Sequence, residues 1–422
     1  MSEAVIGIDV GTSGLRAALC RRDLSIIAMS QRAMPLPLQT GGRLMQDPQL
    51  WASALNDVLA DLKPQIEAND VRAIAVDGTS GTILSIDKEG KPLGLASMYN
   101  DVAEEADLAR VAKAASADSA ALGATSPLAR AIPMAKADGA ARILHQADWI
   151  AGLLSGRFDV SDENNALKTG YDPRIGRWPD WIADTGMDVA LLPEVVRAGE
   201  KTGTITRAAA KRFGLGEDVA IVAGTTDGCA AFLASGAVKA GDGVSSLGTT
   251  LTIKLLSETP VFAPQYGIYS HRIGDNWLAG GASNTGGAAI ASQLSREEIA
   301  RLTPLIKPDE PTGLDYYPLP KPGERFPIND PKYAPRFTPK PDDDRVFFQA
   351  ILEGIASIEV LAYQRLAELG ASPLKTLRSV GGGAANEGWT RIRQNKLGVP
   401  FLAAASEHAA VGAAVLAWRG IA

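Results

Sequence analysis

The stretch from Ile6 to Leu19 constrains the fold of this chain more than any other. Two apolar runs flank a short turn, Gly11 to Gly14, which carries the hydroxyl side chains of Thr12 and Ser13. This pattern predicts two antiparallel strands joined by a tight turn. Glycines at both ends allow backbone N–H groups to approach an anion closely. The sequence therefore indicates a hairpin that binds phosphate or, in the plainer interpretation, an ordinary surface hairpin.

Asp9 stands at the end of the first apolar run, directly before this turn. A carboxylate at that position would repel a phosphate group unless a cation lay between the two. Asp9 thus favours a metal-bound phosphate, and a solvated aspartate in a simple hairpin is the alternative.

The size and charge of the chain indicate its domain number and exclude some kinds of partner. A length of 422 residues predicts two domains. The net charge of −6, without a basic run, argues against nucleic acid as a partner. No apolar run reaches membrane-spanning length, so we expect no membrane association. Two cysteines, Cys20 and Cys229, are consistent with a reducing cytoplasm and not with a disulfide framework.

Strand and helix patterns alternate along the chain. Residues 49–62 form an amphipathic helical pattern, and residues 71–77 and 219–223 are short apolar strands. The alanine-rich segment 101–147 is predicted to be several helices broken by prolines, and 345–369 a further buried helix. This alternation predicts an α/β fold with a mainly parallel or mixed sheet.

The opening pattern recurs in the second half. Residues 244–255 again show a strand, a turn containing Gly248 and Thr249, and a strand. Two related domains, each with a phosphate turn, would explain the recurrence; a chance likeness between two glycine hairpins is the alternative. The second copy lacks the aspartate, so its turn would bind an anion through amides and hydroxyls alone.

Two further loops join strands to helices. Asp227 lies in the glycine-bounded loop 224–228, at a strand end where α/β enzymes usually keep their chemistry. The triple glycine at 381–383 follows another strand and leads through Asn386 into a helix. Backbone without side chains there would lie flat against a nucleoside, whereas a flexible turn is the simpler interpretation.

These motifs together resemble the FGGY family of carbohydrate kinases, within the actin-like ATPase superfamily. The resemblance extends over nearly the whole chain in the same order and rests on residues 7–13, 224–228, 247–250, 381–386 and 407–414. It implies an α/β fold of two actin-like (ribonuclease H-like) ATPase domains with a catalytic cleft between them. The expected domains are 1–228, for sugar and phosphate, and 229–422, for ATP and its adenosine.

The resemblance also implies phosphoryl transfer from ATP, with Mg²⁺, to a sugar hydroxyl. Asp227 would be the general base, and Asp9 would hold the metal. The residues expected to bind the nucleotide are Gly11, Thr12, Ser13, Arg16, Gly248, Thr249, Gly382, Gly383 and Asn386. No Walker-type glycine-lysine motif is present, so the metal, amides and hydroxyls must supply the electrostatic stabilisation.

The loop Asp77 to Gly81 occupies the first substrate element of that family, and Tyr99 to Asp101 the second. The arginine usual after the second element is absent, and Ala103 stands near its place. Small side chains in the first loop favour D-ribulose as acceptor, with D-xylulose or another polyol as alternatives. The residues expected to contact the sugar are Asp9, Thr79, Ser80, Asp101 and Asp227. Turn formation and helix capping are the alternative roles for Thr79, Ser80 and Asp101.

Two other classes of function were weighed against the sugar kinase. A chaperone-type ATPase of the same superfamily is disfavoured by the substrate loop at 77–82, and a catalytically inactive sugar sensor by the presence of Asp9, Thr12 and Asp227. The expected ligands are thus a small sugar and ATP, bound by a monomer or a homodimer.

Overall fold

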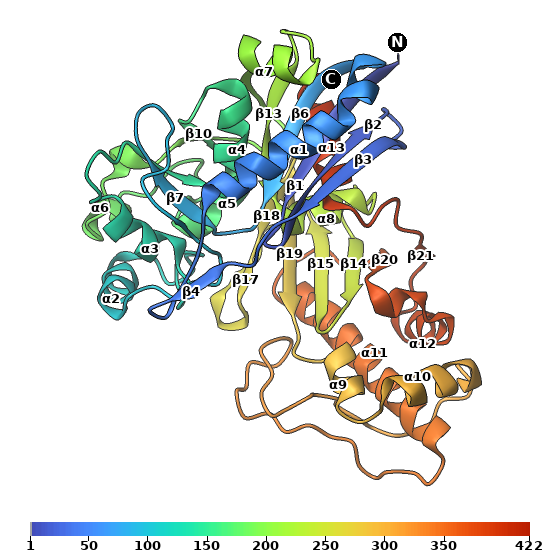
Figure 1. The fold of residues 1–422 in the computed structure, drawn as a ribbon. Coiled ribbons are helices and arrows are strands. Elements are labelled where there is room, and N and C mark those ends of the chain that lie inside the picture. The colour runs from blue at the N-terminus through green and yellow to red at the C-terminus, as the bar shows by residue number, and fades with distance from the viewer. Residues whose placement is uncertain (1) are drawn as a thin grey trace. The chain divides into compact units, whose positions relative to one another are not determined.

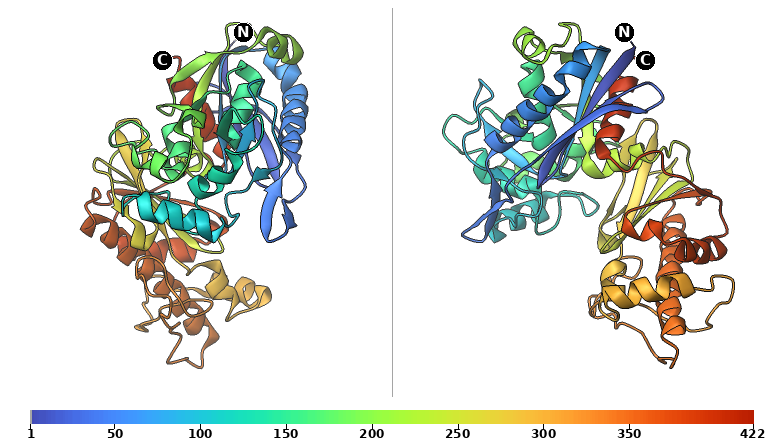
Figure 2. Two further views of the ribbon diagram at one scale, coloured as in Figure 1. Left: turned by 90° about the vertical axis from the view of Figure 1, so that its left-hand side faces the viewer. Right: turned by 45° about the vertical axis from the view of Figure 1, so that its right-hand side comes forward.

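The computed structural model describes residues 2–422, which form two compact units. The first unit contains residues 1–234, 271–274 and 408–422, and the second contains 235–270 and 275–407. The observed division therefore differs from a single boundary after residue 228. The helix that begins at Asp227 and the last fifteen residues belong to the first unit, because both pack against its central sheet. The N- and C-termini accordingly lie near each other (Figure 2).

A six-stranded mixed sheet forms the centre of the first unit, in the order β12-β13-β6-β1-β2-β3 (Figure 1). Strands β1 (Glu3–Val10) and β2 (Gly14–Cys20) are the predicted hairpin, and β3 (Ile26–Ala33) extends it. Strands β6 (Asp70–Gly78) and β13 (Ala220–Thr226) run parallel to β1. Their carboxyl ends therefore lie at one edge of the sheet.

Helices cover both faces of this sheet. Helix α1 (Pro48–Glu67) begins after the Asp47 cap and buries Trp51 and Leu55 in the same core as Ile6 and Ile8. Helix α13 (Ala409–Arg419) packs on the other face, against β1 and β6.

The contact between α13 and the sheet is unusually close. A Cβ atom at Gly7 would lie 1.8 Å from the carbonyl oxygen of Ala410, and one at Gly412 would lie 1.8 Å from that of Ala230. Only glycine fits at these two positions. The close approach fixes β1, and with it Asp9, against the C-terminal helix.

The remaining elements of the first unit surround the central sheet. A second, five-stranded sheet has the order β4-β5-β8-β7-β9. Its strands are β4 (Leu38–Thr40), β5 (Arg43–Gln46), β7 (Ile83–Ile86), β8 (Ala96–Ser97) and β9 (Arg142–His145). The other elements are α2 (Glu105–Ala114), α3 (Pro127–Met134), α4 (Gln146–Ser155), β10 (Val160–Asp162), α5 (Glu163–Ala166), α6 (Trp181–Asp184), β11 (Glu194–Val196), β12 (Lys201–Thr204), α7 (Arg207–Phe213), α8 (Asp227–Ala234) and β18 (His271–Ile273).

One prediction for this unit is wrong. The sequence predicts only helices across 101–147, but β9 is a strand that pairs antiparallel with β7 along its full length. The pairing buries Ile143 and Leu144. Tertiary packing therefore overrides the helix propensity of the alanine-rich segment.

The second unit repeats the strand arrangement of the first. Its strands β14 (Asp242–Leu247) and β15 (Leu251–Ser257) form the second predicted hairpin, and β19 (Asn276–Ala282) pairs antiparallel with β15. Strand β20 (Thr376–Val380) pairs parallel with β14, as β6 does with β1. The order β19-β15-β14-β20-β21 thus corresponds to β3-β2-β1-β6-β13. This correspondence supports the interpretation of the two hairpins as related elements.

The other elements of the second unit follow the sheet. They are β16 (Phe262–Ala263), β17 (Ile268–Tyr269), α9 (Gly287–Ala291), α10 (Arg296–Leu302), α11 (Asp344–Glu368), α12 (Glu387–Leu397) and β21 (Phe401–Leu402). Helix α11 is the one helix within residues 2–422 that is long and apolar enough to cross a membrane. Because 78% of its most apolar window is buried, it is the core helix of this unit.

A buried ion pair joins α11 to α12. Arg393 donates from Nε to Glu359 at 2.6 Å and from Nη2 at 2.7 Å, and both residues are at most 1% exposed. Glu359 also accepts from Ser245 on β14, and Arg393 donates to Ser379 on β20. The pair therefore connects both helices to the two strands that carry the glycine turns of this unit.

We expect Arg393→Met to destabilise the second unit by about 3–5 kcal/mol, because it leaves the buried Glu359 carboxylate without its cation. Scanning calorimetry should show a lower unfolding temperature for this unit. The double variant Arg393→Met with Glu359→Leu is the control, and we expect it to recover most of the loss. Equal unfolding temperatures for Arg393→Met and the unmodified chain would show that Arg393 does not stabilise this unit.

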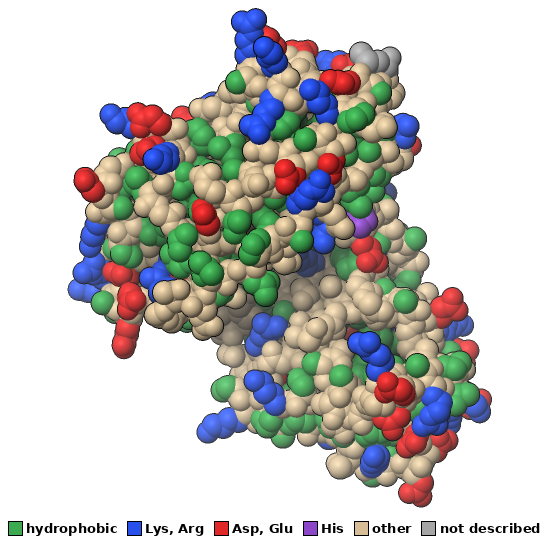
Figure 3. All heavy atoms as spheres, viewed as in Figure 1, with side chains coloured by type: hydrophobic (Ala, Val, Ile, Leu, Met, Phe, Trp, Pro, Cys, Tyr) green, Lys and Arg blue, Asp and Glu red, His purple; other side chains and the backbone are tan. Residues whose placement is uncertain are grey.

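Charged side chains are mixed over the surface that Figure 3 shows. Lys and Arg side chains alternate with Asp and Glu, and no continuous basic area is visible on that face.

Candidate active site

Three carboxylates meet at the carboxyl edge of the central sheet in the first unit. Asp9 and Asp77 lie opposite each other in the parallel register of β1 and β6. Asp227 follows directly after β13, which pairs with β6 as far as Thr226 and Gly78. The predicted loop 224–228 is thus strand up to Thr226, and Asp227 is the first residue of α8.

The carboxylate of Asp9 is 7% exposed and has one cationic neighbour. Arg16 Nη1 lies 3.4 Å from Asp9 Oδ2, and Arg16 Nε donates to Gln31. Burial raises the pKa of Asp9 and the charge of Asp227 adds to the rise, although Asp77 and Arg16 act against it. Arg16 therefore contacts the carboxylate that the sequence assigns to the metal.

Asp77 is the most unusual group of the cluster. It is fully buried, and neither of its oxygens receives a hydrogen bond from a donor within residues 2–422. Its side chain lies beside Asp9, close enough for a hydrogen bond if one of the two acids holds a proton. Burial, followed by the charges of Asp9 and Asp227, holds the pKa of Asp77 well above its usual value. The sequence placed Asp77 in the substrate loop but assigned it no role.

The raised pKa of Asp77 predicts a pH-dependent stability. An acid in the unfolded chain ionises near pH 4, so stability falls as pH rises from there toward the higher pKa of the folded state. Asp77→Asn should remove this loss and raise the thermal unfolding temperature more at pH 8 than at pH 5. The exposed Asp138→Asn variant is the matched control. An unfolding temperature of Asp77→Asn that is lower at pH 8 would show that the ionised carboxylate is stabilising.

The surplus of negative charge fits a cation. Three acids face one arginine, and the two oxygens of Asp77 lack donors. Within residues 2–422, however, no group of three or more His, Cys, Asp or Glu side chains is placed to hold a metal ion alone. Mg²⁺ commonly takes one or two carboxylates together with phosphate oxygens of a substrate. The residues present therefore fit a metal that arrives with a nucleotide.

The first phosphate-type turn has the predicted hairpin geometry. Gly11 donates from its backbone N–H to Gly14 at 2.9 Å, which closes the turn. The carbonyl of Thr12 accepts from Gln46, and that of Ser13 accepts from Met34. Both carbonyls are thus held by the protein, whereas the side chain of Ser13 is exposed. The turn is fixed from behind and open at its tip.

The second turn is arranged in the same way. The carbonyls of Gly248 and Thr249 accept from Gly287 and Ala288, at the start of α9. Gly248 and Thr249 are both exposed. Their backbone N–H groups have no acceptor within the part of the chain that the structure describes. These donors remain available to an anion.

The triple glycine forms a short 3₁₀ turn after β20. A Cβ at Gly383 would lie 2.6 Å from the Trp389 ring and 2.8 Å from Leu247 Cβ, so this glycine is needed for packing. A Cβ at Gly382 would meet nothing within 4 Å. Asn386 caps α12 by accepting from the N–H of Trp389. Of the predicted nucleoside contacts, Gly382 therefore offers the most accessible backbone.

The loop after β6 is held by an internal network. Thr79 Oγ1 lies 2.6 Å from Thr82 Oγ1 and donates to Gln146 Oε1 at 2.8 Å. Thr79 is buried and its hydroxyl is hydrogen-bonded within the protein, while its contact with the sugar stays a prediction. Ser80 is half-buried, and its hydroxyl has no partner within residues 2–422. Ser80 remains a predicted sugar contact.

Asp101, the next predicted sugar contact, is held by an ion pair and hydrogen bonds. It is fully buried and accepts from Arg43, from the Leu44 N–H at 2.9 Å and from the Ser97 hydroxyl at 2.6 Å. Burial alone would raise the pKa of Asp101, but these hydrogen bonds, the Arg43 contact first, hold it below its usual value. Both oxygens of Asp101 therefore accept hydrogen bonds within the protein, and its contact with the sugar stays a prediction.

Asn164 stabilises the strand that delivers Asp227. Its Nδ2 donates to Thr225 Oγ1 at 3.0 Å and to the Arg272 carbonyl at 2.9 Å, and its Oδ1 accepts from the Arg272 N–H. No role for Asn164 was predicted from the sequence. An asparagine two residues after an Asp cap was the available signal, because the amide of a buried asparagine must find partners.

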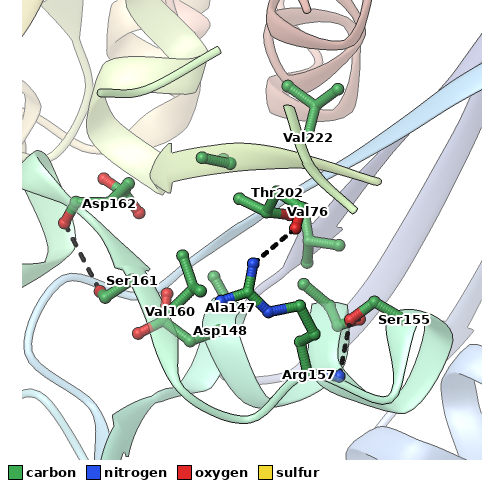
Figure 4. A pocket seen from close by; sticks show the side chains of 13 residues that line it. Val76, Ala147, Asp148, Ser155, Arg157, Val160, Ser161, Asp162, Thr202 and Val222 are labelled. Carbon is green, nitrogen blue, oxygen red and sulfur yellow. Dashed lines mark hydrogen bonds between the residues drawn. The ribbon is translucent and has the colours of Figure 1, made fainter. Parts of the chain in front are cut away.

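A small polar pocket lies behind β6 and β13 (Figure 4). Its lining includes Val76, Asp148 and Asp162. His145 lies 2.7 Å from Asp148 and 2.9 Å from Thr169 Oγ1, and it is 1% exposed. Burial, and then the charge of Asp148, raises the pKa of Asp162 to about 7. His145 is thus hydrogen-bonded to Asp148 and Thr169, and the Asp162 carboxylate accepts from Asn165, so we assign the pocket a structural role.

The fold and these turns define a two-unit α/β protein with a phosphate-type turn in each unit. The chain belongs to the FGGY family of carbohydrate kinases: residues 4–119 and 133–234 match its N-terminal domain, and 243–421 its C-terminal domain. It is therefore a carbohydrate kinase, which transfers a phosphoryl group to an alcohol. The resemblance and the fold class predicted from sequence are confirmed.

Individual relatives agree with this assignment. The chain is 28% identical over 441 residues to xylulose kinase of Streptomyces coelicolor, covering 98% of this chain and 87% of the relative. Its fold is similar to that of a xylulose kinase from Rhodospirillum rubrum, with TM-score 0.85, 24% identity, and coverage of 99% and 90%. Plasmodium falciparum glycerol kinase, solved with ADP, has TM-score 0.84 at 16% identity, with coverage of 100% and 90%.

Proposed function

We propose that this kinase phosphorylates the terminal hydroxyl of a ketopentose with ATP as the donor. D-ribulose is the first candidate acceptor and D-xylulose the second. The clustering of Asp227 with Asp9 and Asp77 at one sheet edge carries the proposal, because it sets a carboxylate base beside a cation-binding carboxylate. The names of the relatives favour a pentulose, and the small side chains of the loop at 77–81 favour D-ribulose within that class.

Asp227 acts as the general base in this proposal. It accepts the proton of the acceptor hydroxyl as the oxygen attacks the γ-phosphate. Its Oδ1 already accepts from the N–H of Gly228 at 2.6 Å, which orients the carboxylate at the start of α8. A carboxylate is basic enough for this role, because phosphoryl transfer proceeds through a loose transition state and depends mainly on positioning.

The nucleotide is assigned to the turns of both hairpins and to the triple glycine. Thr12, Ser13 and the exposed N–H groups of Gly248 and Thr249 donate to phosphate oxygens, and Gly382 lies against the nucleoside. Mg²⁺ held by Asp9 supplies positive charge to the phosphates when it is bound. ADP in the solved glycerol kinase relative supports an adenine nucleotide as the donor.

We also infer a reducing cytoplasm as the location of the protein. Cys20 and Cys229 are both buried free thiols. Burial raises the pKa of the Cys20 thiol to about 12, so it resists oxidation. The oligomeric state, monomer or homodimer, is left to measurement by light scattering.

A coupled assay of ADP release tests the proposal. D-ribulose, D-xylulose, ribitol, xylitol, glycerol and gluconate are compared at equal concentrations. We expect kcat/KM for a ketopentose to exceed that for each pentitol by at least about tenfold, as for a site that hydrogen-bonds a group the analogue lacks. A preference for glycerol or gluconate would show that the acceptor class is wrong. ADP release that is independent of every sugar would contradict the kinase proposal itself.

A further inference from the structure

An ion pair lies next to the predicted acceptor loop. Arg43 on β5 donates from Nε to both oxygens of Asp101 at 3.0 Å and from Nη2 to Oδ2 at 2.7 Å. Asp101 belongs to the second substrate element, where the sequence lacks the usual arginine near Ala103. The structure thus supplies a guanidinium to this carboxylate from a different strand.

Hydrogen bonds connect this pair to the loop that follows Asp77. Ser97 donates to Asp101 at 2.6 Å, and the buried Arg130 donates to Ser97 Oγ at 2.7 Å. Arg130 Nη2 donates in turn to the carbonyl of Gly81 at 2.6 Å. The N–H of Tyr99 donates to Thr82 Oγ1, which joins the two substrate elements directly. A chain of hydrogen bonds therefore connects the Arg43–Asp101 pair to the loop that follows β6.

Of the two guanidinium groups in this network, that of Arg43 is the accessible one. Its side chain is 30% exposed, while that of Asp101 is fully buried. Nη1 of Arg43 has no hydrogen-bond partner within residues 2–422, whereas the Nη groups of Arg130 are bonded to carbonyl and hydroxyl oxygens. Glu104 and the buried Arg130 are the other charged groups that interact with Arg43. Asp101 and Ser97 fix the guanidinium plane, so the direction of Nη1 is set in advance.

Ketopentoses offer a matching acceptor. A ketopentose closes its five-membered ring through the terminal hydroxyl, so only the open-chain form presents that hydroxyl for phosphorylation. The open-chain form carries a free carbonyl, which accepts hydrogen bonds but cannot donate them. A guanidinium donates and cannot accept. It therefore suits a carbonyl better than groups that also need an acceptor.

We propose that Arg43 is the specificity residue for the acceptor: Nη1 donates a hydrogen bond to the carbonyl end of the open-chain ketose. This inference rests on the proposed function and deepens it. Arg43 selects the substrate, and Asp101, Ser97 and Arg130 are positioning residues that act through it.

Arg43→Lys tests the role, because it keeps the positive charge beside Asp101 and removes the fixed fork of donors. We expect KM for the ketopentose to rise about tenfold or more, as when a hydrogen bond to a charged group is lost, with KM for ATP unchanged. The preference for ketopentose over pentitol should fall by a similar factor. Arg142→Lys is the matched control, since Arg142 lies on β9, an edge strand of the sheet that contains β5.

The double variant Arg43→Gln with Asp101→Asn covers the case in which Arg43→Lys does not fold, because it removes both charges of the Arg43–Asp101 pair together. We expect the same rise in KM for the ketopentose. A lower unfolding temperature with unchanged KM in either variant would overturn the proposal and leave Arg43 a structural residue. If the unmodified chain phosphorylates no ketopentose, the proposed function fails instead, so the two failures are distinguishable.

Discussion

Asp227→Ala is expected to abolish sugar-dependent ADP release while nucleotide binding is retained. Removal of a positioned general base lowers the rate by about 10²–10⁴-fold. Asp227 has this effect in our account because it is the carboxylate that follows β13 into α8, beside Asp9 and Asp77. The decisive readout is kcat in the coupled assay, with ADP affinity measured separately by calorimetry.

The matched control for this variant is Asp184→Asn, which changes an exposed aspartate of the same unit. It should leave kcat unchanged. Full sugar-dependent turnover by Asp227→Ala would show that another group takes the proton.

The second large effect is expected for Asp9→Ala, which should remove magnesium-dependent activity. Asp9 is buried near the end of β1, and Arg16, which contacts its carboxylate, is half exposed. Without the carboxylate, a cation with its bound phosphates loses its protein anchor. Activity should be measured as Mg²⁺ is varied, and Mn²⁺ binding in the presence of ADP should be followed by electron paramagnetic resonance.

Arg16→Gln is the control variant for that experiment. It removes the positive charge facing Asp9 without removing the carboxylate, so it should retain Mn²⁺ binding. If the dependence of activity on Mg²⁺ concentration is unchanged in Asp9→Ala, Asp9 does not hold the metal.

The hairpins and the strand ends were predictable because they depend on local chemistry. A glycine-bounded turn between two apolar runs specifies its own geometry, and Asp9 and Asp227 lie at strand ends whatever surrounds them. The recurrence at 244–255 then predicted the second unit. Strand β9 could not be predicted in this way, because its pairing with β7 is a long-range contact that overrides an alanine-rich composition.

Long-range contacts also explain why the roles of residues in the acceptor loops were hard to predict. Asp101 and Thr79 have residue types that suit sugar binding, but their partners, Arg43 and Gln146, lie 58 and 67 residues away in the chain. Contacts between residues so far apart cannot be predicted from the spacing of residues in the sequence. For the same reason Asp77 received no role, although burial next to Asp9 makes it the most perturbed acid of the edge. The fold could therefore be predicted from the sequence better than the roles of the individual site residues.

The most direct test of the central claim identifies the product. The protein is incubated with ATP, Mg²⁺ and D-ribulose or D-xylulose, and the mixture is examined by ³¹P nuclear magnetic resonance. We predict one new phosphomonoester signal, split by the two protons of the terminal carbon, that forms in step with ADP and is absent with Asp227→Ala. Inorganic phosphate in place of this signal, or a phosphoester at another carbon, would contradict the account.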